Sequence, residues 1–183
     1  MKKKSESKKK VFFLFILIIG AILFSIGFIA VDRKSGGKII MSGDIAPEFH
    51  LQTLDGYEVR LSDSRGKVVM VHFWATWCAP CIEEMPTLQK LYHDLKNKRF
   101  ELYAVSVDEG GAKAVTAFMK EHRLDVPVLL DLDRTISGLY GTFRFPETYI
   151  VDHRGIVRYK AIGPRDWATP WNVQIVEAIL DSK

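Results

Sequence analysis

Cys78 and Cys81 are the only cysteines of the chain, and they lie three positions apart. An apolar run over residues 68–73 leads into the pair, and a helical pattern follows from Ile82 onward. Side chains at spacing i and i+3 share one face of a helix, so both thiols belong to its first turn. Unpaired N–H groups and the positive end of the helix dipole stabilise a thiolate there, and the thiolate is the attacking form of cysteine. The spacing therefore predicts a redox-active dithiol.

A structural disulfide and a metal site each fit the cysteine pair less well. A disulfide staple across so short a loop would contribute only about 2 kcal/mol to stability. A zinc site needs two further ligands, and the histidines show no ligand-type spacing. They are His50, His72, His93, His122 and His153. We predict no metal and no cofactor beyond a Cys78–Cys81 disulfide. A peroxidatic cysteine is disfavoured because Ala75, and not threonine or serine, precedes Cys78 by three residues.

The positive charge of the chain is concentrated in a basic tail at its N-terminus. The formal net charge is +4, but residues 1–10 hold six lysines and one acid, and subtracting this +5 leaves −1 for the remainder. This distribution gives no basic face for nucleic acid.

The next segment, residues 11–31, contains no charged residue and would span roughly 31 Å as a helix, enough for a bilayer core. We predict an uncleaved transmembrane anchor because a signal peptide has a shorter apolar region and small residues before its cleavage site, where this chain has Phe28. The basic tail then stays in the cytoplasm, and residue 32 onward lies outside it.

Residues 32–42, with Ser35, Gly36 and Gly37, form a predicted linker to a domain over residues 43–183. A hairpin is expected over 51–61, with a type I′ turn at Asp55–Gly56. Further strands are expected at 68–73, 100–107 and 126–130, helices at 79–97, 112–122 and 133–140, and a second hairpin at 149–161. The final helix begins after Thr169 and has Trp171 and Val176 on its buried stripe. Helix-linked strands pair in parallel, so we predict an α/β sandwich with a mixed central sheet.

Several motifs resemble the thioredoxin superfamily, in particular its membrane-anchored TlpA/ResA/DsbE (CcmG) branch. They are Gly43–Phe49, Leu54–Gly56, Leu61–Asp63, Arg65–Val69, Phe73–Cys81, Glu84–Pro86, Pro146–Thr148 and Ile156–Tyr159. The resemblance implies a thioredoxin-like three-layer sandwich with an N-terminal hairpin extension and a single N-terminal transmembrane helix.

The resemblance also assigns roles to individual residues. Cys78 matches the nucleophilic cysteine, Cys81 the buried resolving cysteine, and Pro146 a cis-proline that faces the dithiol. Trp77 and Phe145 would form an apolar substrate-binding rim with Pro146, and Pro80 and Glu147 would support the dithiol.

Of four acid–base residues near the dithiol, two keep open interpretations. Glu147 is either a proton carrier for Cys81 or a solvated carboxylate. His72, which stands where thioredoxin has a buried acid, is either a proton relay or a hydrogen-bonded strand residue. Glu83 and Glu84 are interpreted as acids that stabilise the start of the helix.

The expected activity is thiol–disulfide exchange outside the cytoplasm. The resemblance favours a monomeric reductase of protein disulfides, for example those of apocytochrome c haem-site cysteines, that receives electrons from a membrane donor of the CcdA/DsbD type. A general thiol oxidase or isomerase, and a copper or zinc chaperone, are the alternatives.

Overall fold

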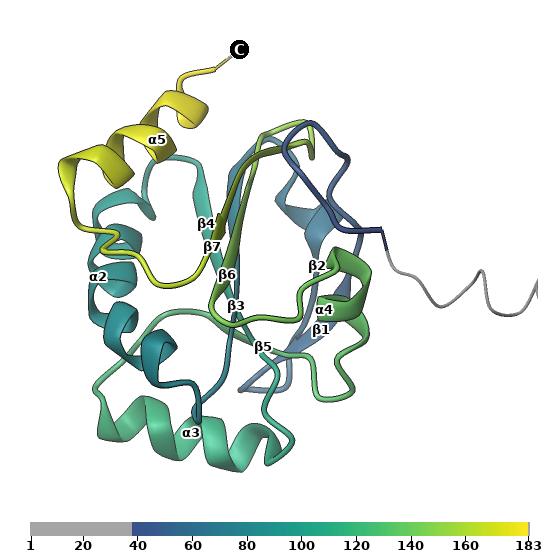
Figure 1. Cartoon of the computed structure of the whole chain (residues 1–183), viewed down its shortest axis with the longest axis vertical. Helices are drawn as coiled ribbons and strands as arrows, with labels where there is room; N and C mark the ends of the chain where they lie inside the picture. The colour runs from purple at the N-terminus through teal and green to yellow at the C-terminus, as the bar shows by residue number, and fades with distance from the viewer. Residues whose placement is uncertain (1–37, 183) are drawn as a thin grey trace, which may run out of the picture. The chain divides into compact units, whose positions relative to one another are not determined.

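A seven-stranded mixed sheet forms the centre of residues 38–182, the part of the chain that the computed structural model describes (Figure 1). The strands follow the order β2-β1-β5-β4-β3-β6-β7 across the sheet. They are β1 (His50–Thr53), β2 (Glu58–Arg60), β3 (Val68–Trp74), β4 (Phe100–Ser106), β5 (Val128–Leu130), β6 (Glu147–Val151) and β7 (Val157–Ile162). The helices are the 3-10 helix η1 (Leu61–Ser64) and the α-helices α2 (Ala79–Leu95), α3 (Gly111–Glu121), α4 (Thr135–Tyr140) and α5 (Pro170–Leu180).

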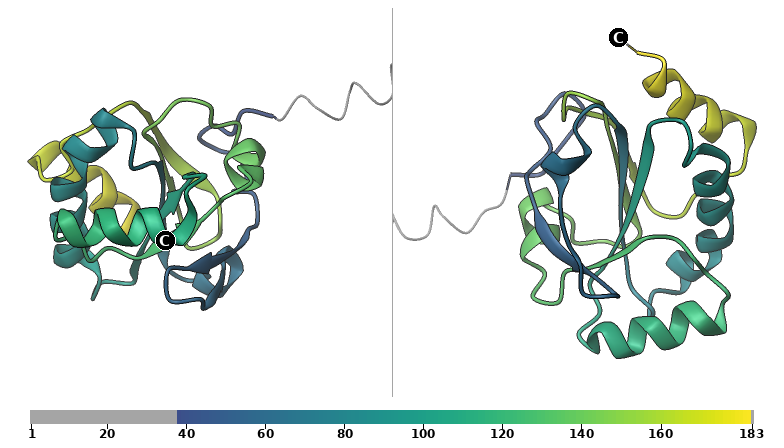
Figure 2. Two further views of the ribbon diagram at one scale, coloured as in Figure 1. Left: turned by 90° about the horizontal axis from the view of Figure 1, so that it is seen from below. Right: turned by 180° about the vertical axis from the view of Figure 1, so that it is seen from behind.

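The strand pairing confirms the predicted mixed sheet. β3 pairs with β4 and β4 with β5 in parallel, whereas β6 and β7 form an antiparallel hairpin whose first strand pairs with β3. Helices α2, α3 and α5 lie on one side of the sheet and α4 on the other (Figures 1 and 2). Every residue of β3 is buried because both faces of this strand are covered, which explains its almost continuous apolar sequence.

The turn of the first hairpin differs from the prediction. A type I′ turn needs a positive φ at both central residues, but Asp55 does not have one and Gly56 does, with φ 84°. Thr53 N–H donates to the Tyr57 carbonyl, and Gly56 N–H donates to the Thr53 carbonyl. The connection is therefore a three-residue loop in which only glycine takes the left-handed conformation.

The buried face of α5 is also rotated from the predicted stripe. Trp171 is 70% exposed, while Val176 and Asn172 are buried. The Asn172 amide donates to the Asp166 carbonyl at 2.7 Å, which turns this side of the helix toward the protein. The predicted start of the helix is confirmed, because Thr169 caps it and Pro170 follows.

The predicted anchor over residues 11–31 lies outside the described residues, as do the basic tail and most of the linker. Between residues 38 and 182, no helix is long and apolar enough to cross a membrane.

Candidate active site

The two cysteines form a disulfide at the junction of β3 and α2. Cys78 is the N-cap residue of α2, and its carbonyl accepts hydrogen bonds from the N–H groups of Cys81 and Ile82. Pro80 occupies the first turn, where a missing backbone donor costs nothing. Cys78 is 6% exposed and Cys81 is 0% exposed. An incoming thiol or disulfide therefore reaches Cys78 first.

A buried carboxylate fixes the loop that carries Cys78. Asp108 accepts hydrogen bonds from the backbone N–H of Thr76 and from its hydroxyl, the latter at 2.6 Å. The Ser106 hydroxyl also donates to Asp108, at 2.7 Å. These bonds link the segment before the dithiol to the end of β4, and they were not foreseen from the sequence.

The Pro146 loop lies at the same end of β3 as the dithiol. The peptide bond between Phe145 and Pro146 is cis. Phe73 of β3 pairs with Glu147 of β6, which places Pro146 beside the last residue of β3. The Pro146 carbonyl accepts from Gly163 N–H at 2.9 Å. Within residues 38–182, the structure gives the main-chain N–H and C=O of Phe145 no hydrogen-bond partner.

An aromatic pair forms one border of this region. The rings of Trp77 and Phe145 meet edge to face, with centroids 6.0 Å apart. Trp77 is 58% exposed, and the Arg134 guanidinium lies 5.9 Å from its ring centroid. The structure thus brings Trp77, Phe145 and Pro146 together beside the disulfide, as the rim interpretation requires.

Glu147 lies in a buried ion pair. Lys160 Nζ of β7 lies 2.6 Å from Glu147 Oε1, and both side chains are almost fully buried. The Tyr149 hydroxyl donates to the same oxygen at 2.9 Å, and Lys160 lies over the Tyr149 ring. Glu147 is therefore not a solvated carboxylate in this structure. The proton-transfer role predicted for it stays a prediction.

A second buried acid, Glu84, lies on the inner face of the dithiol helix. Glu84 follows Cys81 by three residues in α2, on the same face of the helix. Its Oε2 accepts from Arg165 N–H at 2.7 Å, and its Oε1 lies 3.2 Å from His72 Nε2. The other ring nitrogen of His72 lies 2.9 Å from the Thr148 hydroxyl.

Burial shifts the pKa of both members of this pair. It lowers the pKa of His72 to about 3, so the imidazole is uncharged at neutral pH. It raises the pKa of Glu84 to about 7, against the opposing effects of the Arg165 N–H, the Trp167 indole and the Arg165 charge. Glu84 therefore gains and loses a proton near neutral pH, as a general acid–base group must.

Comparison with known proteins identifies the family. A sequence model of the AhpC/TSA family matches residues 42–160. The chain is 37% identical over 163 residues to the thiol-disulfide oxidoreductase ResA of Oceanobacillus iheyensis. The aligned region covers 84% of this chain and 83% of that protein. This chain belongs to the AhpC/TSA family, among its ResA-type thiol–disulfide oxidoreductases.

Further relatives of this thiol–disulfide oxidoreductase agree. ResA of Bacillus subtilis is 34% identical over 151 residues, which is 82% of this chain and 84% of that protein. A Chlorobium tepidum protein described as the thiol:disulfide interchange protein DsbE has the same fold, with a TM-score of 0.71 and 30% identity. The aligned region covers 77% of this chain and 99% of the Chlorobium tepidum chain. These relatives support the thioredoxin-like α/β fold and an oxidoreductase that uses the Cys78–Cys81 pair.

In this oxidoreductase Glu84 reaches a pocket of about 310 Å³ at the surface. The pocket is also lined by Arg165 and Asp166 and, from α2, by Glu83 and Thr87. Glu84 itself is only 3% exposed. A carboxyl group that is buried against the core but adjoins a solvent-facing pocket can exchange protons with water without being hydrated.

The sequence contained a signal for Glu84 that the interpretation as a helix-stabilising acid missed. Positions 81, 84, 85 and 88 form one helical stripe, and the other three hold Cys81, Met85 and Leu88, all buried. The acidic side chain at position 84 shares this stripe and is therefore buried with them. Glu83, one position earlier, is exposed, but neither acid lies in the first turn of α2, so the structure does not support the helix-stabilising interpretation for either of them.

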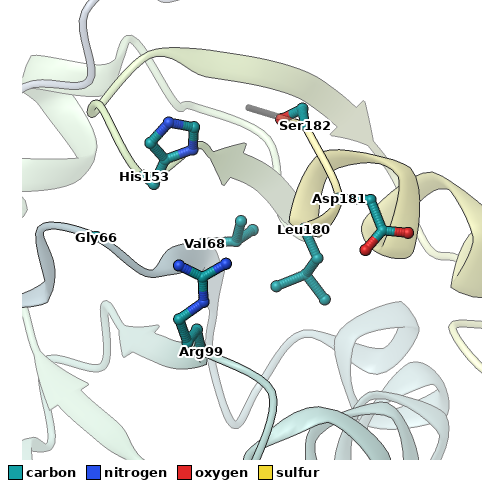
Figure 3. Close-up of a pocket in the computed structure, with 7 residues that line it drawn as sticks. All are labelled: Gly66, Val68, Arg99, His153, Leu180, Asp181 and Ser182. Atoms are coloured by element: carbon teal, nitrogen blue, oxygen red, sulfur yellow. The ribbon is translucent and has the colours of Figure 1, made fainter.

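A second pocket, of about 340 Å³, lies at the opposite end of β3 (Figure 3). Figure 3 shows Arg99 and His153 beside it, with Leu180 and Asp181 at the end of α5. Neither cysteine lines this pocket, so it is separate from the dithiol site. In the part of the chain that the structure describes, no group of three or more His, Cys, Asp or Glu side chains is placed to hold a metal ion.

Proposed function

We propose that this oxidoreductase reduces protein disulfides outside the cytoplasm, with Cys78 as the nucleophile, Cys81 as the resolving thiol and Glu84 as the acceptor of the Cys81 proton. The observation that carries the proposal is the asymmetry of the site. Cys78 is the more exposed cysteine of the pair, at the start of α2, while Cys81 is fully buried on the helix face that holds a titrating carboxyl group.

The first step uses the reduced protein. The Cys78 thiolate attacks one sulfur of a substrate disulfide, that disulfide breaks, and its second sulfur leaves as a thiolate. The positive end of the α2 dipole stabilises the Cys78 thiolate before attack. The result is a mixed disulfide between Cys78 and the substrate.

The second step releases the reduced substrate. Cys81 gives its proton to the Glu84 carboxylate and attacks the Cys78 sulfur. The mixed disulfide breaks, the Cys78–Cys81 disulfide forms, and the first substrate sulfur leaves as a thiolate. Two electrons have then passed to the substrate, and Glu84 returns its proton to water through its pocket.

The substrate binds, in this proposal, as an extended segment against the Pro146 loop. The main-chain groups of Phe145 have no partner within residues 38–182, so they are free to pair with a strand of the substrate. The exposed Trp77 ring supplies apolar contact beside Cys78. For the substrate itself we propose protein disulfides such as those of apocytochrome c haem-site cysteines, which the resemblance implies.

The direction of electron flow is supported by the burial of Cys81. A strong oxidant has a stabilised reduced form, which requires well-stabilised thiolates. A thiolate at Cys81 would be buried in apolar surroundings beside a carboxyl group that is half ionised near pH 7. A second negative charge there is unfavourable, so the reduced form is not strongly stabilised and the dithiol tends to give up its electrons.

Turnover requires a new pair of electrons, for which we propose a membrane donor of the CcdA/DsbD type. An anchor over residues 11–31 would hold the domain on the outer side of the membrane, where that donor acts. The uncharged apolar sequence of this segment and the lysines before it support this location.

The experiment that tests the proposal is trapping of substrates in cells by the full-length Cys81→Ser variant. Without Cys81 the mixed disulfide cannot resolve, so substrate proteins should remain attached to Cys78 and dissociate on treatment with dithiothreitol. Cys78→Ser is the matched control and should trap nothing. Equal trapping by both variants, or none by either, would contradict the assignment of the two cysteines.

A further inference from the structure

The imidazole of His72 bridges the dithiol helix and the strand that follows the Pro146 loop. His72 belongs to β3 and is wholly buried. Its Nε2 lies 3.2 Å from Glu84 Oε1 of α2, and its Nδ1 lies 2.9 Å from the Thr148 hydroxyl of β6. Each ring nitrogen thus faces one oxygen atom away from water. The Nδ1 contact is a hydrogen bond, whereas His72 Nε2 and Glu84 Oε1 approach each other without hydrogen-bond geometry and have no other partner among the described residues.

Each of these oxygens can change its hydrogen-bonding role. A hydroxyl donates or accepts, a protonated carboxyl group donates, and a carboxylate only accepts. A neutral imidazole has one donor nitrogen and one acceptor nitrogen. Two complete arrangements follow. In the first, protonated Glu84 donates to Nε2, and Nδ1–H donates to Thr148. In the second, the Glu84 carboxylate accepts from Nε2–H, and the Thr148 hydroxyl donates to Nδ1.

We propose that His72 is the positioning residue of Glu84, and that its uncharged imidazole holds the carboxyl group in both protonation states by carrying its single proton on Nδ1 or on Nε2. This inference rests on the proposed role of Glu84 as acceptor of the Cys81 proton. When Cys81 loses its proton to Glu84, the single imidazole proton changes its place from Nε2 to Nδ1. The proton count of His72 is unchanged, and one proton in total moves from Cys81 to Glu84.

The surroundings of the pair favour an uncharged imidazole. Near Glu84, Arg165 contributes a positive charge and its N–H, and these two groups and the Trp167 indole all act to lower the pKa of Glu84. Glu83 and Asp166 line the pocket that Glu84 adjoins. Within residues 38–182, Glu84 is the only ionisable group that the structure pairs with His72. Burial holds the pKa of His72 near 3, so the tautomer of this side chain, and not its charge, responds to Glu84.

The advantage of this arrangement is that His72 Nε2 and Glu84 Oε1, which have no hydrogen-bond partner in the structure of residues 38–182, can pair with each other in either protonation state of Glu84. An unpaired buried donor or acceptor destabilises the state that contains it. At position 72, a side chain that could only accept or only donate a hydrogen bond would favour one protonation state of Glu84. It would therefore shift the pKa of Glu84 away from neutral pH. His72 instead can pair with Glu84 in both states once the 3.2 Å contact tightens into a hydrogen bond, and it then transmits the state of Glu84 to Thr148, two residues from Pro146.

The test is nitrogen NMR of the full-length chain labelled with ¹⁵N-histidine, in which ring couplings distinguish the two neutral tautomers and the charged form. His72→Asn identifies the signals by their loss. Between about pH 5.5 and about pH 8.5 the ratio of Nε2–H to Nδ1–H should rise about tenfold or more, with its midpoint at the Glu84 titration. In Glu84→Gln the ratio should not change with pH.

Two threonine variants separate this role from simple packing. Thr148→Val removes the hydroxyl that donates to or accepts from Nδ1. It should favour the Nε2–H form and lower the pH midpoint, because Nδ1–H would lack an acceptor. Thr142→Val removes a different buried hydroxyl, bonded to Tyr149, and should leave the midpoint where it is in the unsubstituted chain. Equal shifts in both variants would overturn the inference.

Three more results would also overturn it. They are a charged imidazole anywhere in this pH range, a single tautomer throughout, and a pH-dependent ratio that persists in Glu84→Gln. These results would leave the proposed reductase intact if Cys81→Ser still traps substrates. Failure of trapping together with a tautomer change would instead reject the proposed function and keep the coupling between Glu84 and His72.

Discussion

Lys160 Nζ lies 2.6 Å from Glu147 Oε1, in a pair that is almost completely removed from water directly after Pro146. Lys160 also donates to the Ile40 carbonyl at 3.1 Å. One lysine therefore joins the start of β6, the adjacent strand β7 and the segment that enters the domain. The Pro146 loop is held in place by this charge pair, while Glu84 is left to exchange protons.

Replacement of Lys160 by methionine should strongly destabilise the domain, because it leaves the Glu147 carboxylate buried without its partner. We expect the free energy of unfolding to fall by about 3–5 kcal/mol. Chemical denaturation of the oxidised full-length chain measures this change. Lys90→Met removes the exposed pair with Asp94 and should cost less than about 1 kcal/mol. A loss that is the same for both variants would mean that burial adds nothing to the Glu147 pair.

Replacement of Glu84 by glutamine should slow the step in which Cys81 resolves the mixed disulfide. The amide cannot accept the Cys81 proton, and loss of a general base costs about a hundredfold in rate. Rapid-quench measurement of mixed-disulfide decay at neutral pH gives the rate. Glu83→Gln changes an exposed neighbour on the same helix and should alter the rate less than about twofold. If Glu84→Gln matches the unsubstituted chain across the pH range, Glu84 is not the acceptor.

The stability of the oxidised protein should carry the signature of the raised Glu84 pKa. The folded protein holds this proton up to about pH 7, whereas the unfolded chain releases it near 4.5. The contribution of Glu84 is therefore fully present below 4.5, and about 3 kcal/mol of it is lost as the pH rises through 7. The difference in unfolding free energy between the unsubstituted chain and Glu84→Gln, measured from pH 4 to 8, should fall by this amount. If this difference in unfolding free energy instead increased with pH, folding would lower the pKa of Glu84 and not raise it.

Trp77 should matter for protein substrates and not for small disulfides. Trp77→Ala removes an exposed ring beside Cys78, and loss of one aromatic anchor at an interface costs about 2 kcal/mol or more. We expect kcat/KM for a protein disulfide to fall at least about tenfold, with little change for a small aromatic disulfide. Trp171→Ala, which removes an even more exposed tryptophan from α5, is the control and should change neither value. A loss of equal size with both substrates would place Trp77 in the chemistry and not in docking.

The dithiol and its supporting elements could be predicted from local sequence alone. An apolar run of strand length, two cysteines at helical spacing and a proline between them define the junction of β3 and α2 without any distant contact. The burial of Glu84 could also have been predicted, because its position on the buried stripe of α2 follows from the spacing of Cys81, Met85 and Leu88.

The pairing of Glu147 with Lys160 could not be predicted in the same way. Tyr149 faces Lys160 across the β6–β7 hairpin, and Glu147 is its diagonal neighbour, but an irregularity between Ile150 and Val151 shifts the register. A shift of one residue would have turned Lys160 to the other face of the sheet. The partner of His72 was equally hidden, because β3 and α2 meet through tertiary packing and not through sequence spacing.

The reduction potential of the Cys78–Cys81 pair tests the proposed direction of electron flow most directly. The full-length protein is equilibrated with glutathione mixtures and alkylated, and its oxidised fraction is read by mass. A reductase should give a potential near that of thioredoxin, about −270 mV. A value near that of the strong oxidant DsbA, about −120 mV, would contradict the account, because such a dithiol would accept electrons from its substrates.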